Sequence, residues 1–141
     1  MNKEEVFAQI DYWVNFAQDD LHCFPNDKAK EDVSKLFKAL YDIGQLKWYI
    51  LDGNKGLMVY GITPDFRDGQ SVNELFMYIK PEFRGSIKLF KELVTHLEMV
   101  AIAKGCKSVR IASNIGYNDD LVLKVLQRWG YKTDVVVKYM G

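Results

Sequence analysis

One segment of the chain joins two strands through a helix, and it limits the fold more than any other feature. Residues 72–80 have the alternating pattern of a strand, residues 87–104 place apolar side chains at helical spacing, and residues 108–112 form a second apolar strand. Such a connection makes its two strands parallel members of one sheet. The sequence therefore predicts a βαβ crossover whose strands are neighbours or nearly so.

Two amphipathic helices are expected before the sheet, over residues 4–18 and 26–43, because apolar side chains recur three and four positions apart. Asn26 or Asp27 is a suitable N-cap for the second helix, and Gly44 is expected to end it. The side chains expected to face inward are Val6, Ile10, Trp13, Val14, Ala17, Val33, Leu36, Phe37, Leu40 and Tyr41.

A three-stranded antiparallel meander is expected next. Residues 48–51 and 57–62 are β-forming runs joined by a glycine-containing turn, and a further turn at 65–70 leads into the strand 72–80. Alternation along this third strand puts Leu75, Met77 and Ile79 on one side and Glu74, Phe76 and Tyr78 on the other.

The C-terminal part predicts a short helix from residue 118 or 119 to 129, with Leu121, Val122, Val125, Leu126 and Trp129 facing the sheet, and a last strand over 131–140. The predicted order is ααβββαβαβ. It corresponds to an α/β (α+β) fold with a mixed, mostly antiparallel sheet, helices on both faces and a central βαβ crossover.

Composition limits the class of protein. The 141 residues include 48% hydrophobic residues, which suits one domain spanning 1–141. Lysine plus arginine and aspartate plus glutamate both total 19, so the overall charge favours neither nucleic acid nor a membrane surface as a partner. The two cysteines, Cys23 and Cys106, are far apart and no secretory leader or membrane span is evident, which predicts a cytoplasmic protein.

The turn between residue 80 and the following helix is the first candidate binding site. The sequence Arg84-Gly85-Ser86 leads from a strand directly into a helix, whose first N–H groups and dipole attract an anion such as phosphate.

In this arrangement the chain resembles the GCN5-related N-acetyltransferase superfamily. The resemblance covers roughly residue 46 to the C-terminus. It is carried by the order of elements and by three motifs, Ile79-Lys80-Pro81-Glu82-Phe83-Arg84-Gly85, Ala101-Ile102-Ala103-Lys104-Gly105 and Leu126-Gln127-Arg128-Trp129-Gly130-Tyr131. It implies acetyl-CoA as cosubstrate and acetyl transfer to a primary amine, without a metal.

The resemblance assigns cofactor contacts to three parts of the chain. The pyrophosphate loop would comprise Arg84, Gly85, Ser86, Ile87, Lys88, Leu89 and Phe90. Met77, Tyr78 and Ile79 would offer backbone groups to the pantetheine arm, with Asn114 on the opposite strand; the alternative for Asn114 is a turn residue that ends its strand. The family's loop has small residues where this chain has Ile87 and Leu89, so the anion site requires that these side chains point away into the core.

Acetyl transfer to an amine needs a base, and a proton donor can assist the departing thiolate. Glu74 is the predicted base, since related enzymes often carry a carboxylate on this strand; the simpler alternative is a solvated strand residue. The family's tyrosine donor corresponds to Leu126, which cannot donate a proton. Tyr117 is the candidate in its place, although loop tyrosines more often serve packing.

The acceptor would be a small-molecule or protein amine, held between the two N-terminal helices and residues 61–70, where Trp13, Tyr60 and Phe66 suggest a partly apolar pocket. The alternative function is a non-catalytic binding or regulatory protein of the same fold that has lost its cofactor. The valine-rich run 135–137 could pair between subunits of a homodimer if it lies at a sheet edge.

Overall fold

The computed structural model describes residues 1–67, 69–85, 87–112, 119–133, 138 and 140. Its elements are α1 (Lys3–Leu21), α2 (Asp27–Asp42), β1 (Lys47–Ile50), β2 (Gly56–Asp65), β3 (Gly69–Ile79), α3 (Ile87–Lys104), β4 (Ser108–Arg110) and α4 (Asp119–Arg128). The predicted order is confirmed through α4. In the predicted last strand, residues 131–133, 138 and 140 belong to no strand, and the others lie outside the described residues.

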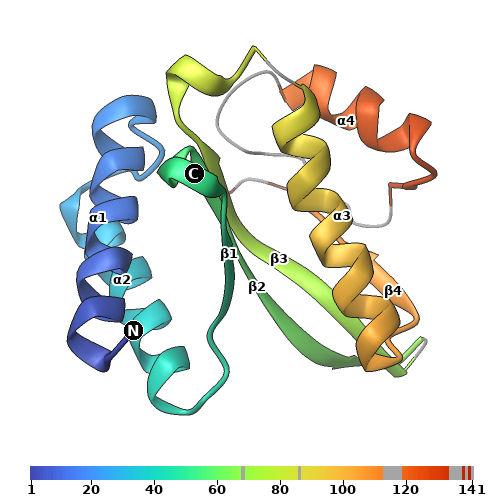
Figure 1. Cartoon of the computed structure of the whole chain (residues 1–141), viewed down its shortest axis with the longest axis horizontal. Coiled ribbons are helices and arrows are strands. Elements are labelled where there is room, and N and C mark those ends of the chain that lie inside the picture. Colours follow the sequence, from blue (N-terminus) through green and yellow to red (C-terminus); the bar gives the residue numbers. More distant parts are fainter. Residues whose placement is uncertain (68, 86, 113–118, 134–137, 139, 141) are drawn as a thin grey trace.

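The four strands form one mixed sheet in the order β1-β2-β3-β4. β1 pairs with β2 and β2 with β3 antiparallel, whereas β3 pairs with β4 parallel, which confirms the meander and the βαβ crossover. The hairpin between β2 and β3 is tighter than predicted, because Asp65 pairs with Gly69 and the strands extend into the expected turn. Figure 1 shows the sheet between the helix pairs α1/α2 and α3/α4.

A β-bulge in β3 changes the predicted faces of that strand. Val59 of β2 pairs with Phe76, but the next residue, Tyr60, pairs with Glu74, so Leu75 is an extra residue without a partner in β2. Directly opposed residues point to the same side of a sheet, and Glu74 therefore lies on the face of Tyr60, with Met77 and Ile79. The alternation predicted across this point was wrong, and Leu75 is exposed rather than inward.

The first core lies between the sheet and the helices α1 and α2. It is built from Val6, Ile10, Trp13, Val14, Ala17, Phe37, Leu57, Val59 and Tyr78. All five inward positions predicted for α1 are buried. On α2, Phe37 is buried as expected, with its ring centre 6.0 Å from that of Phe76 on β3, but Leu36 is 52% exposed.

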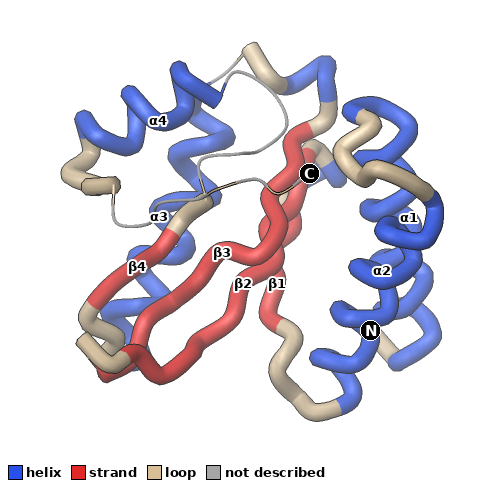
Figure 2. Tube along the Cα trace, turned by 180° about the vertical axis from the view of Figure 1, so that it is seen from behind, coloured by secondary structure: helices blue, strands red, loops and turns tan. Residues whose placement is uncertain are grey.

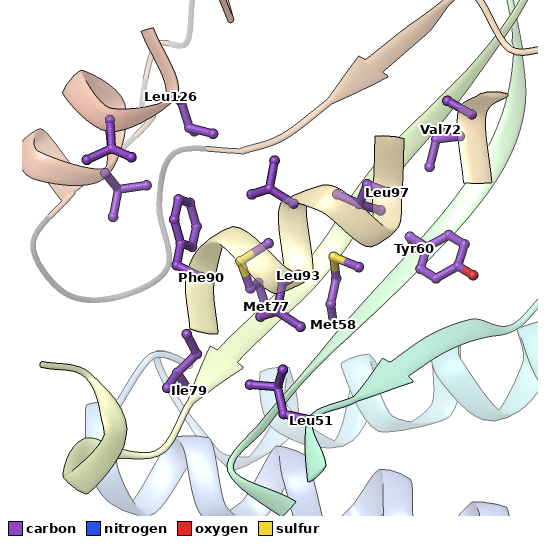
Figure 3. Packing of buried hydrophobic residues seen from close by; sticks show 14 residues of the cluster. Leu51, Met58, Tyr60, Val72, Met77, Ile79, Phe90, Leu93, Leu97 and Leu126 are labelled. Carbon is purple, nitrogen blue, oxygen red and sulfur yellow. The ribbon is translucent and has the colours of Figure 1, made fainter. Parts of the chain in front are cut away.

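The second core lies on the opposite face of the sheet, under α3 and α4. Figure 3 shows Met58, Tyr60, Val72 and Met77 of the strands directed at Phe90, Leu93 and Leu97 of α3. From α4, Val122, Val125 and Leu126 are buried here as predicted, whereas Leu121 is exposed. The helices and the two cores hold β3 at the centre of the molecule, so both of its faces are covered over most of its length.

Side chains define the helix ends near the sheet. Asn2 and Asn26 cap α1 and α2 through hydrogen bonds to the backbone N–H groups of Glu5 and Ala29. After α1, the amide of Gln18 both donates to and accepts from the backbone of Phe24, which fixes the connection to α2. None of the helices in the described part of the chain has the length and apolar character of a membrane span.

Candidate active site

β3 and β4 separate part-way along the sheet and leave a fork between them. Residues 71–73 pair with residues 108–110, and no described strand pairs with β3 on this side beyond residue 73 (Figure 2). Residues 74–79 thus present about 20 Å of strand edge, at roughly 3.3 Å per residue. The N–H and C=O groups of such an edge can bind an extended ligand as an added strand would.

Glu74 lies at the point where the two strands separate. Its carboxylate accepts a hydrogen bond of 3.3 Å from the backbone N–H of Ala112, just beyond β4, so the side chain bridges the fork. Burial raises the pKa of Glu74 from the ordinary 4.5 to about 7, and the hydrogen bond from Ala112 opposes this only in part. A carboxylate with such a pKa is able to accept a proton near neutral pH.

The side chains that follow Glu74 on β3 are occupied in the two cores. Met77 and Ile79 are 4% and 2% exposed under α3, and Tyr78 is 1% exposed under α1. The phenol of Tyr78 donates to Asp20 at 2.6 Å. These three predicted cofactor residues can therefore contact a ligand in the fork only through their main chain, as the sequence predicted for them.

The predicted pyrophosphate loop comprises a turn of 3-10 helix, Pro81–Phe83, and the start of α3. A Cβ atom at Gly85 would meet no atom within 4 Å, so the backbone is open there. Ile87 is 54% exposed, so its side chain does not meet the condition set for the anion site, which was that it point away into the core. Leu89 is half-buried against the α3-side core and Phe90 is buried in it, stacked on Trp129 at 5.7 Å between ring centres.

The Arg84 side chain turns back from the loop toward α1. Its Nε donates to the carbonyl oxygen of Ile79 at 2.9 Å, its Nη2 donates to Asp20, and the guanidinium carbon lies 5.4 Å from the centre of the Tyr78 ring. The guanidinium thus anchors the loop to α1. Ser86, Asn114 and Tyr117, the other predicted site residues, lie outside the described residues, and their roles stay predictions.

A surface pocket of about 560 Å³ lies beside the first two turns of α3. It is lined by Leu51, Asp52, Lys55, Glu82, Phe83, Gly85, Lys88, Leu89 and Glu92. The loop residues Gly85, Lys88 and Leu89 therefore meet the β1–β2 turn here. The sequence did not predict that the β1–β2 turn lines this pocket, because no local pattern relates residues 51–55 to residues 82–92.

The aromatic residues expected to line an acceptor pocket are mostly elsewhere. Trp13 and Tyr60 are 1% and 7% exposed, one in each core, and only Phe66 is fully exposed at the β2–β3 hairpin. The Tyr60 hydroxyl instead lies 3.2 Å from Nε2 of His96 on α3. Within the described ranges, no group of three or more histidine, cysteine, aspartate or glutamate side chains could hold a metal ion.

Protein-family models and curated proteins give no match to the sequence, but solved structures do. A candidate acetyltransferase from Pyrococcus furiosus superposes with a TM-score of 0.73 at 19% identity, covering 100% of this chain and 97% of that one. A predicted acetyltransferase from Clostridium acetobutylicum, solved with acetyl-CoA, gives 0.73 at 13% identity, with 100% and 92% covered. The aminoglycoside N-acetyltransferase AAC(6')-Iy in complex with CoA gives 0.67 at 20% identity, with 100% and 91% covered.

The chain has the GCN5-related N-acetyltransferase fold. Identities of 13–20% establish the architecture and leave the activity to be argued from the site itself.

The site of this acetyltransferase fold suits an acyl-CoA in three respects. The edge of β3 beyond residue 73 offers backbone groups to an extended arm with amides. The open space at Gly85 leaves the backbone just before α3 accessible, where N–H groups and the helix dipole favour phosphate. Glu74 lies at the far end of the same edge. One extended ligand could therefore contact both the loop and the carboxylate.

Proposed function

We propose that this protein is an N-acetyltransferase that moves an acetyl group from acetyl-CoA to a primary amine. The observation that carries the proposal is Glu74, a half-buried carboxylate with a pKa of about 7 at the fork between β3 and β4. A general base works best when its pKa lies near the working pH. The fold's relationship to acetyltransferases supports the same reaction class.

In this proposal Glu74 accepts a proton from the acceptor ammonium, directly or through a water molecule, so that the neutral amine can attack the thioester carbonyl. A C–N bond forms, the C–S bond breaks, and the thiolate leaves and takes up a proton. Leu126 is 3% exposed and has no acidic group, so it has no part in the last step. Water can protonate the thiolate, and Tyr117 remains the predicted side-chain donor.

The cofactor would lie along the open edge of β3. Backbone groups of Met77, Tyr78 and Ile79 would pair with its pantetheine arm, and the first turn of α3, from Ile87 to Phe90, would bind the pyrophosphate. Bound acetyl-CoA supplies the activated acetyl group, whereas the protein contributes position, the base and the anion site.

The acceptor is proposed to be a small-molecule amine. One structural neighbour, AAC(6')-Iy, is an aminoglycoside N-acetyltransferase and has been solved with a bisubstrate analog, CoA-S-monomethyl-acetylneamine, at 18% identity to this chain. This supports a small amine over a protein substrate.

A thermal-shift titration tests cofactor binding. Acetyl-CoA that binds the native state should stabilise it by RT ln(1 + [L]/Kd), about 2.7 kcal/mol at a hundredfold excess over Kd, and raise Tm with concentration. Inorganic pyrophosphate at equal concentration controls for general anion binding. No shift with millimolar acetyl-CoA would refute the proposal and favour the non-catalytic alternative.

Activity is then tested by thiol release with a panel of small amines. Wild-type protein should release CoA in an amine-dependent way, and Glu74→Gln should bind acetyl-CoA with unchanged affinity but turn over far more slowly. Turnover by Glu74→Gln equal to wild type across a pH series would remove Glu74 from the mechanism.

A further inference from the structure

One face of α1 contacts the end of β3 and the turn that follows it. Tyr12, Phe16 and Asp20 are spaced four residues apart, so they share a face of the helix. The Lys80 ammonium lies 4.8 Å from the centre of the Phe16 ring and donates to the Tyr12 hydroxyl at 2.7 Å. α1 therefore contacts the segment that leads to the start of α3.

Asp20 makes the contacts that reach furthest along this segment. It accepts hydrogen bonds from the Tyr78 hydroxyl and from Nη2 of Arg84, and Nε of the same guanidinium donates to the Ile79 carbonyl oxygen. The side chains of Asp20 and Arg84 are only 20% and 17% exposed. One arginine thus connects a carboxylate of α1 to the main chain at the end of β3.

The position of Asp20 is unfavourable for a carboxylate on its own. It lies in the last turn of α1, which contains no basic residue, and the C-terminal end of a helix dipole repels negative charge. Burial also raises the pKa of Asp20, yet the hydrogen bonds from Tyr78 and Arg84 outweigh burial and hold its pKa below the ordinary value. The contacts to Tyr78 and Arg84 therefore offset a placement that the helix alone would disfavour.

We propose that Asp20 is a positioning residue for the cofactor: by holding Arg84, it fixes the turn at residues 80–85 and so the direction in which the first N–H groups of α3 point. The inference rests on the proposed function, since it concerns the same anion site. Without the Asp20 carboxylate, the poorly exposed guanidinium loses the ion pair that connects it to α1, and the hydrogen bond from its Nε to the Ile79 carbonyl oxygen is no longer supported from that side.

The test compares acetyl-CoA affinity, measured by isothermal titration calorimetry, among variants that are folded by circular dichroism. Asp20→Asn should weaken binding about tenfold, equivalent to about 1.4 kcal/mol. Asp20→Glu, which keeps the charge, should restore most of the affinity. Asp19→Asn is the matched control, because Asp19 is an exposed carboxylate of the same helical turn, and it should bind as wild type does.

Arg84→Gln removes the same ion pair from the other side and should weaken binding to a similar or greater extent. If Asp20 acts through Arg84, Asp20→Asn should cause no further loss in the Arg84→Gln background. Arg84→Gln alone also serves as the test if Asp20→Asn fails to fold. Asp20→Asn with wild-type affinity, or additive effects in the double variant, would overturn the inference while leaving the proposed function intact. A wild-type protein that does not bind acetyl-CoA would refute both.

Discussion

Replacing Glu74 by glutamine should change the pH dependence of stability in a defined direction. The folded protein raises the pKa of Glu74 from 4.5 to about 7, so between these values the folded state binds more protons than the unfolded chain. Wild-type stability therefore contains a contribution that is present at low pH and is lost as the pH rises toward 7. Glutamine is neutral throughout and keeps an oxygen that can accept from Ala112.

The magnitude follows from the same numbers. A pKa difference of one unit is worth about 1.36 kcal/mol, so a carboxyl with these two pKa values loses at most about 3.4 kcal/mol of folding stability across the interval. Because Glu74 is half-buried rather than sealed from water, we expect about 1–2 kcal/mol. Above about pH 7, Glu74→Gln should thus be more stable than wild type by about 1–2 kcal/mol. Below about pH 4, the two proteins should have nearly equal stability.

Urea denaturation at pH 5 and pH 8 measures the effect as a difference between the two proteins, so that other titrating groups cancel. Glu31→Gln on α2 is the control, since it removes an exposed carboxylate far from the fork and should leave the wild-type pH dependence unchanged. A difference between Glu74→Gln and wild type that is the same at both pH values would refute the burial argument, and with it the assignment of Glu74 as a base tuned to neutral pH.

Two further predictions concern the sheet and its contact with α3. Gly56→Ala should destabilise the protein by at least about 2 kcal/mol, because the added Cβ would lie 2.5 Å from the Tyr78 carbonyl oxygen. In Gly61→Ala on the same strand, the added Cβ meets nothing nearer than 3.8 Å, so this control should be destabilised far less. Equal Tm values for the two variants would contradict this. Burial lowers the pKa of His96, so the stability of the folded protein should fall as the pH drops below 6.5. Urea denaturation at pH 7 and pH 5 should show this loss in wild type but not in His96→Gln. The same loss of unfolding free energy in both proteins would refute the prediction.

Local patterns in the sequence predicted most of the architecture. The bounds 87–104 of α3 are confirmed because Pro81 and Gly105 mark both sides of a strongly periodic run. The inward face of α1 is confirmed for the same reason. The prediction that Leu36 and Leu121 face inward was wrong, because both side chains are exposed. Periodicity gives the apolar stripe of a helix but not the width of the surface that neighbouring elements cover.

The features that shape the candidate site depend on contacts between distant parts of the chain. Asp20 and Arg84 are 64 residues apart, and no motif at either end indicates the pair. The raised pKa of Glu74 depends on burial beside Ala112, 38 residues further on. The proposed roles of the pyrophosphate-loop residues remain predictions, as do those of Asn114 and Tyr117.

The extra residue at Leu75 has a consequence for chain length. β2 keeps strict alternation through the hairpin, but β3 has one residue more over the same stretch, so positions on either side of Leu75 follow opposite parity. Even-numbered residues before the bulge and odd-numbered residues after it face α3. Deleting Leu75 would therefore remove the bulge and leave Glu74 and Phe76 in regular alternation, so Val72, Glu74, Met77 and Ile79 would all keep their faces and their partners in β2. The register between β2 and β3 thus permits a chain that is one residue shorter at this point.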